Sequence, residues 1–96
     1  MVKQVFDVYS DAGHGWVKVN KDLLQQIGIA DKITSYSYER GDYAYLEEDV
    51  DLTTFYNAYK DKFGVEVRFR SHYSDHSKIR GYNRYYWYKN QRVYKI

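Results

Sequence analysis

Three sets of polar residues in this 96-residue chain have side chains that could bind a metal ion, take part in catalysis or bind a partner. The first group consists of Asp11, His14, His72 and His76. Carboxylate and imidazole are ligands that zinc and manganese accept. However, all four residues lie in turn-like stretches, where Asp and His are common without a metal. The sequence therefore predicts no metal site and no cofactor.

The second group, Ser10, Asp11 and His14, has the residue types of a nucleophile, an orienting carboxylate and a base. In a catalytic triad the carboxylate must reach the imidazole nitrogen that faces away from the nucleophile, and three residues of one loop seldom achieve this. Asp11 is better explained by an Asx turn, in which its carboxylate accepts a nearby backbone N–H. The sequence therefore predicts no catalytic residue, and we expect a protein that is not an enzyme.

The third group is an acidic run of Glu47, Glu48 and Asp49, with Asp51 shortly after it. We expect the run to be exposed as an acidic patch that could bind a basic partner or imitate the phosphates of a nucleic acid. The alternative is structural, because negative charge at the end of a strand also suits the N-terminus of a following helix. Asp51 is predicted to be the N-cap of that helix.

The end of the chain carries the strongest functional signal. Residues 1–67 have 7 Lys and Arg against 12 Asp and Glu, a net charge of −5, whereas residues 68–96 have 8 against 1, a net charge of +7. Aromatic residues are interleaved with these cations. In single-stranded nucleic-acid binding, cations follow the phosphates and rings stack on the bases, and protein interfaces are enriched in the same residue types. The predicted partner-binding or nucleic-acid-binding residues are Arg68, Arg70, Lys78, Arg80, Tyr82, Arg84, Tyr85, Trp87 and Arg92.

Composition limits how many of these rings can be exposed. The chain has 13 Tyr, no Cys and no Pro, and only 23 residues are Val, Leu, Ile, Phe or Met. Tyrosine rings must therefore supply part of the core, with their hydroxyls at its edge or in water, and we expect about half of the C-terminal rings to be buried. A second interpretation of the charge asymmetry is that the basic end lies on the acidic body of the same chain.

The hydrophobic pattern predicts one α+β domain over residues 1–96, in which two short helices cover one face of a small antiparallel sheet of five to seven strands. The expected order is ββαββαβ plus a C-terminal hairpin. Helices are expected over residues 21–27, between Asn20 as N-cap and Gly28 as C-cap, and over 51–63, which Gly64 ends. The expected strands are residues 2–9, 16–19, 36–40, 43–47, 65–70, 82–88 and 92–96, with a polar loop over 72–77.

No apolar run approaches 18 residues, and the first residues lack the layout of a signal peptide. We therefore expect a cytoplasmic protein that has no membrane partner.

Four stretches of the sequence are distinctive. They are SDAGHGWVKV (residues 10–19), GIADKITSYSY (28–38), YLEED (45–49) and KIRGY (78–82). Together they resemble a family of small proteins of phages and other mobile elements with the motifs SDxGHGWxKV and GIADKIxxYSY, over about residues 7–85. Residues 86–96 then correspond to a C-terminal extension. The resemblance implies an accessory protein of a virus or plasmid that acts in the cytoplasm of the host cell, and it carries over no activity and no catalytic residue.

These observations predict a non-enzymatic binding protein that inhibits or modulates a host nucleic-acid-handling defence system, as an anti-CRISPR protein does. Either the acidic patch or the basic-aromatic end would bind the partner, which is a host protein, a nucleoprotein complex, RNA or single-stranded DNA. The protein would act as a monomer or a homodimer. The alternatives are an accessory protein that binds single-stranded nucleic acid, a capture protein for a signalling nucleotide and, least favoured, a metal-dependent nuclease or phosphoesterase.

Overall fold

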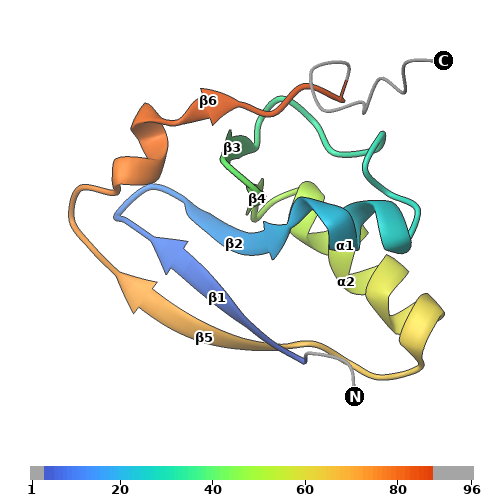
Figure 1. The fold of residues 1–96 in the computed structure, drawn as a ribbon. Helices are drawn as coiled ribbons and strands as arrows, with labels where there is room; N and C mark the ends of the chain where they lie inside the picture. The colour runs from blue at the N-terminus through green and yellow to red at the C-terminus, as the bar shows by residue number, and fades with distance from the viewer. Residues whose placement is uncertain (1–3, 88–96) are drawn as a thin grey trace, which may run out of the picture.

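The computed structural model describes residues 4–87, which form a six-stranded sheet and two α-helices (Figure 1). In chain order the elements are β1 (Val5–Ser10), β2 (Gly15–Asn20), α1 (Lys21–Gln26), β3 (Tyr38–Arg40), β4 (Tyr43–Glu47), α2 (Asp51–Phe63), β5 (Arg68–Tyr73), the 3₁₀ helix η1 (Lys78–Gly81) and β6 (Asn83–Arg84). The strands lie in the order β5-β1-β2-β4-β3-β6. The predicted α+β class, with a small sheet and two helices, is confirmed.

Two of the short-range features that the sequence predicts are present. In the turn between β1 and β2, Asp11 Oδ1 accepts the backbone N–H groups of Gly13 and His14 at 2.9 and 3.0 Å, which is the predicted Asx turn. Asn20 caps α1 by accepting the backbone N–H of Asp22 at 2.8 Å. At these two positions the residue type is sufficient to predict the local hydrogen bond.

Both helices pack on the same face of the sheet, as predicted. Phe6 of β1 lies edge-on to Phe55 and Tyr59 of α2, with ring centroids 5.0 and 5.7 Å away. The helix-side core consists of Phe6, Val17, Val19, Leu24, Ile29, Ala30, Ile33, Ala44, Leu46, Phe55, Tyr59, Val67 and Tyr85. Burial of a side chain the size of Leu or Phe contributes about 1.5–3 kcal/mol. This cluster therefore fixes the sheet to its helices.

The sheet is mixed, and the prediction of a wholly antiparallel sheet is wrong for one pair of strands. β1 and β5 run parallel, with Val5 opposite Arg68 and Ser10 opposite Tyr73 (Figure 1). The cause is α2, whose 13 residues span about 20 Å at 1.5 Å per residue. That length returns the chain to the end at which β1 begins, since a strand of six residues is also about 20 Å long. A helical crossover delivers a parallel strand, and local hydrophobic patterns do not reveal it.

Asp51 is not the N-cap of α2, so that prediction is wrong. The cap position is Val50, which makes no side-chain capping bond, and Asp51 is the first residue of the helix. The fully buried Asp51 carboxylate accepts the backbone N–H of Thr34 at 3.1 Å, the Thr34 hydroxyl at 2.7 Å and the Ser37 hydroxyl. Ser37 Oγ in turn accepts the backbone N–H of Glu47 at 2.9 Å. Asp51 therefore ties α2 to the loop before β3.

The segment after β5 also differs from the prediction. The expected polar loop begins inside β5, which pairs with β1 as far as Tyr73, because strand pairing outweighs the polar composition. Of the expected strand over 82–88, residues 82–87 are described, and among these only the two residues of β6 are strand; the helix η1 before them is unpredicted. The last expected strand, residues 92–96, lies outside the described residues.

Candidate functional site

The face of the sheet opposite the helices is lined by aromatic and basic side chains. In β4, Ala44 and Leu46 belong to the helix-side core, so Tyr43 and Tyr45 point to the opposite side. The strand pairings place residues of the other strands on that same side. We call this surface the open face; its strand residues are Val5, Asp7, Tyr9, Trp16, Lys18, Asn20, Tyr38, Arg40, Tyr43, Tyr45, Glu47, Arg68, Arg70, His72 and Arg84.

The connection between β5 and β6, residues 74–82, joins the two edges of the sheet at one end of the open face (Figure 1). A second cluster of buried side chains lies here, formed by Trp16, Tyr38, Tyr45 and Ile79. Tyr82 packs on Tyr45 with the ring centroids 5.1 Å apart. The open face thus has a small aromatic core of its own, and η1 is held against it.

An ion pair fastens this connection to the turn between β1 and β2. Arg80 donates to Asp11 through Nε at 2.6 Å and through Nη2 at 2.9 Å. Its guanidinium carbon lies 5.3 Å from the centroid of the Trp16 ring. The Arg80 hydrogen bonds, helped by the backbone N–H groups of Gly13 and His14, hold the pKa of the Asp11 carboxyl well below its usual range. Arg80, predicted as a partner-binding residue, is placed as a clamp within the fold.

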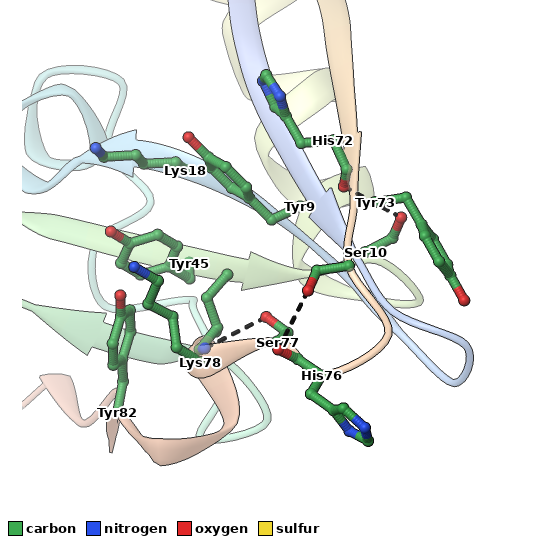
Figure 2. Close-up of a pocket in the computed structure, with 12 residues that line it drawn as sticks. Tyr9, Ser10, Lys18, Tyr45, His72, Tyr73, His76, Ser77, Lys78 and Tyr82 are labelled. Atoms are coloured by element: carbon green, nitrogen blue, oxygen red, sulfur yellow. Dashed lines mark hydrogen bonds between the residues drawn. The ribbon is translucent and has the colours of Figure 1, made fainter.

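A pocket of about 300 Å³ opens on the open face between the sheet and the connection. Four of the lining residues are tyrosines, of which Tyr9, Tyr45 and Tyr82 lie near Lys18 and Lys78, the two residues that supply its ammonium groups (Figure 2). The other lining residues are Ser10, His72, Tyr73, Ser74, His76, Ser77 and Ile79. No Asp or Glu lines this pocket within residues 4–87. Its size is at the lower limit of ligand-binding pockets, so it suits a small anionic group.

One wall of the pocket is held by Asp7. The His72 ring stacks on Tyr9, with centroids 4.9 Å apart and planes inclined by 20°. Asp7 Oδ1 lies 2.9 Å from His72 Nε2 and accepts a hydrogen bond from Arg70 Nε at 2.8 Å. The Arg70 bond, followed by that of His72, lowers the pKa of Asp7 to about 2. Arg70 and His72 are therefore anchored on the open face by an ionised carboxylate.

Other cations of the open face lie over tyrosine rings. The Arg84 guanidinium is 4.6 Å from the Tyr38 centroid, that of Arg40 is 5.1 Å from Tyr82, and Lys18 Nζ is 4.2 Å from Tyr43. Such a contact contributes about 0.5–1 kcal/mol at an exposed site and leaves the charge in place. The rings therefore position these cations without neutralising them. Arg68, at the start of β5, is exposed.

Three predicted binding residues of the C-terminal end do not form part of this surface as described. Tyr85 is only 1% exposed, and its hydroxyl donates to the Ala30 carbonyl at 2.7 Å, so the prediction of an exposed binding ring is wrong. Burial raises the pKa of Tyr85 to about 12. Trp87 is half-buried against the helix-side core. Arg92 lies outside the described residues.

The acidic patch is smaller than predicted. Glu47 is 9% exposed, and its Oε1 accepts the backbone N–H groups of Asp49 and Val50 at 2.9 and 3.0 Å, so the expectation of an exposed Glu47 is wrong. Glu48 and Asp49 are exposed. The Glu47 carboxylate, at the end of β4, is bound by backbone N–H groups of the turn that follows. No sequence pattern predicts these hydrogen bonds.

Within the described chain, one set of metal-compatible side chains comes together. Ligand atoms of His14, Glu47 and Asp49 lie within 4.8 Å of one another. The Glu47 carboxylate is already bound to the backbone of its own turn, so this set is accounted for without a cation. The set weighed from the sequence does not gather, because Asp11 pairs with Arg80, and the His76 ring points away from the pocket (Figure 2).

Sequence reasoning missed the pocket residues of the first half of the chain, Tyr9, Lys18 and Tyr45. The signal that could have found them is the alternation within each strand. In β2, for example, Val17 and Val19 alternate with Trp16 and Lys18, which marks one aliphatic face and one aromatic-basic face.

Comparisons with protein-family models, curated proteins and solved structures gave no match to this chain. Across residues 4–87, no helix has the length and apolar character needed to cross a bilayer. The geometry of the open face is therefore what bears on function.

Proposed function

We propose that the protein is a non-enzymatic binding protein of a phage or mobile element, acting in the host cytoplasm, and that its open face binds single-stranded nucleic acid or a nucleoprotein. Through this surface it modulates a host nucleic-acid-handling defence system. The observation that carries the proposal is the pocket, which combines tyrosine rings and lysines without a lining carboxylate in the described chain. Proteins that bind single-stranded nucleic acid combine cations for the phosphates with rings for the bases.

The charges of the open face support the same ligand. Arg68, Lys78 and Arg84 form no ion pair with a carboxylate of residues 4–87. Cations without an acidic neighbour attract phosphates over a Debye length of about 8–10 Å at physiological salt. The competing route, in which the acidic patch imitates a nucleic acid, loses one of its three carboxylates because Glu47 is buried.

Salt dependence tests the proposal directly. Anisotropy of a fluorescent single-stranded oligonucleotide, DNA or RNA, gives the affinity at several salt concentrations. The logarithm of the affinity should fall linearly with that of salt, and Arg68→Gln or Arg84→Gln should each flatten the slope by about 0.7. Lys62→Gln is the control of equal charge change, because Lys62 is exposed in the last turn of α2.

A pull-down from host lysate, with and without nuclease, identifies the form of the partner. Recovery of a nucleoprotein complex that the Arg68→Gln, Arg84→Gln double variant fails to recover supports modulation of a host system. An oligonucleotide affinity that does not change between low and physiological salt, with recovery that ignores the double variant, would contradict the proposal.

A second function, capture of a signalling nucleotide, is favoured by the size of the pocket. A volume of about 300 Å³ fits one nucleotide rather than a strand.

A further inference from the structure

The pocket gathers ammonium groups from two separate elements. Lys18 comes from β2 and Lys78 from η1, and in Figure 2 both side chains lie on the same side as Tyr45 and Tyr82. Neither ammonium group forms an ion pair with a carboxylate of residues 4–87. A phosphate in the pocket would therefore meet positive charge that no carboxylate of the described residues pairs with.

The aromatic lining offers flat surfaces beside these cations. Tyr9 and Tyr82 are half-buried and offer part of their rings, whereas Tyr45 is buried and supports Tyr82 at an interplanar angle of 59°; Tyr9 is stacked with His72. Tyr9 and Tyr45 come from β1 and β4 on the same face of the sheet, and Tyr82 comes from the connection that packs on that face. A base stacked on such a ring gains about 1–3 kcal/mol, whichever base it is.

Serine hydroxyls of the pocket are occupied by its own backbone. Ser10 Oγ donates to the His72 carbonyl at 3.5 Å, and Ser77 Oγ accepts the backbone N–H of Ile79 at 3.3 Å. These hydrogen bonds fix the backbone that lines the pocket at His72 and Ile79. The side chains left for a ligand are thus the lysines and the tyrosines, which provide charge and stacking and little that would select one base over another.

We infer that the pocket is a receptor for one phosphorylated nucleoside, with the phosphate at Lys18 and Lys78 and the base on the tyrosine rings. The inference rests on the proposed function and names its ligand class. The same chemistry has two sources, a free nucleotide and the phosphorylated 5′ end of a single strand, and the experiment separates them.

Isothermal titration calorimetry with five probes tests the inference. The probes are adenosine 5′-monophosphate, adenosine, inorganic phosphate, a hexanucleotide with a 5′ phosphate and the same hexanucleotide without it. We expect the monophosphate to bind at least about tenfold more tightly than adenosine or phosphate alone, because only it engages both parts of the pocket. A free nucleotide is the ligand if the monophosphate binds as tightly as the phosphorylated hexanucleotide, and a strand end is the ligand if the hexanucleotide binds more tightly.

Two variants separate the phosphate and base contacts. Lys78→Gln should lower the affinity for the monophosphate by about tenfold and leave the affinity for adenosine unchanged. Tyr82→Leu should lower the affinity for both probes by a similar factor. Lys62→Gln on α2 is the matched control and should bind as the unaltered protein does. Thermal melting of each variant confirms folding; should Tyr82→Leu melt early, Tyr82→Phe, which keeps the ring, should retain binding.

The outcomes distinguish this inference from the proposed function. If phosphate and the monophosphate bind with equal affinity, and Tyr82→Leu changes neither affinity, the inference that the pocket recognises a nucleoside is overturned. No binding of any mononucleotide or 5′ end, together with salt-dependent binding of a longer strand that Arg68→Gln weakens, overturns the inference and leaves the proposed function standing. No binding of any nucleotide or strand, with no nucleoprotein recovered from lysate, removes both.

Discussion

The two faces of the sheet are built from the same strands and are closed in different ways. On the helix side, Ala44 and Leu46 of β4 are completely buried, whereas Tyr43 of the same strand is 37% exposed on the open face. The helix-side core is apolar, while the open face is held by contacts such as the Arg80–Asp11 ion pair. Stability therefore resides mainly on one face, and the other keeps charges and rings accessible to a ligand.

The largest expected effect comes from substitutions on the two faces of one strand, β4. Leu46→Ala removes a fully buried side chain and should lower the free energy of unfolding by about 2–5 kcal/mol. Tyr43→Ala should change it by less than about 1 kcal/mol, because its ring is partly exposed and mainly supports Lys18. Urea denaturation of both variants gives the two values, and similar losses would show that the open face is as much a core as the helix side.

A smaller loss of stability is expected from Tyr85→Phe, which removes the hydrogen bond that the Tyr85 hydroxyl donates to the Ala30 carbonyl. The unpaired carbonyl should cost about 1–3 kcal/mol at neutral pH. The folded-state pKa of Tyr85, about 12, lies above its ordinary value. Tyr85 therefore contributes stability below about pH 10 that is lost as the pH rises through 12.

Chemical denaturation between pH 8 and 12 should therefore show a shallower alkaline decline for Tyr85→Phe than for the unaltered protein. Tyr59 and Tyr45 also have raised pKa values through burial, so part of the decline should persist. An alkaline decline that Tyr85→Phe leaves unchanged would contradict the buried hydroxyl.

Asp7→Asn tests how an ion pair of the open face contributes to stability at acid pH. The folded-state pKa of Asp7 is lowered to about 2, first by the Arg70 hydrogen bond. Asp7 therefore contributes stability above its ordinary pKa near 4 that is lost as the pH falls toward 2. The variant should lose stability less steeply over this range in thermal melts, and Asp61→Asn, at an exposed position of α2, is the matched change of charge. An equally steep acid decline in Asp7→Asn would count against the anchored wall of the pocket.

The smallest expected effect is that of chelators, which should not change the melting temperature or ligand binding. The nearest approach to a metal site in the described chain, that of His14, Glu47 and Asp49, has its buried carboxylate bound to backbone N–H groups. Stoichiometric metal by elemental analysis, lost in His14→Ala, would show the opposite.

Local chemistry made much of the fold predictable. Asn20 caps α1 by its own side chain, and Gly64, with a φ of 71°, ends α2 in the left-handed conformation that glycine adopts readily. The hairpin of β3 and β4 turns at Gly41, whose φ is 58°. Each of these features depends on residues within one or two turns of chain, so residue type is sufficient to predict them.

Features that depend on distant residues were not predictable in this way. Asp51 has the type and position of an N-cap, yet its carboxylate binds Thr34 and Ser37 of an earlier loop. Tyr85 stands among basic and aromatic residues, yet its hydroxyl reaches Ala30, 55 positions earlier. The site shows the same limit: Lys78 and Tyr82 were predicted from the basic end, but their partners Tyr9 and Tyr45 come from strands that only the fold brings beside them.

The parallel strand β5 has a consequence for self-association. Within the described chain β5 is one of the two edges of the sheet, and all six of its residues are exposed. An exposed edge is a template on which another strand can form backbone hydrogen bonds, and charged side chains discourage such pairing. Arg68 carries a charge on this edge that no carboxylate of residues 4–87 pairs with, so it opposes the approach of a second copy edge to edge. The same Arg68 that contributes to the positive charge of the open face thereby disfavours growth of the sheet by addition of further chains.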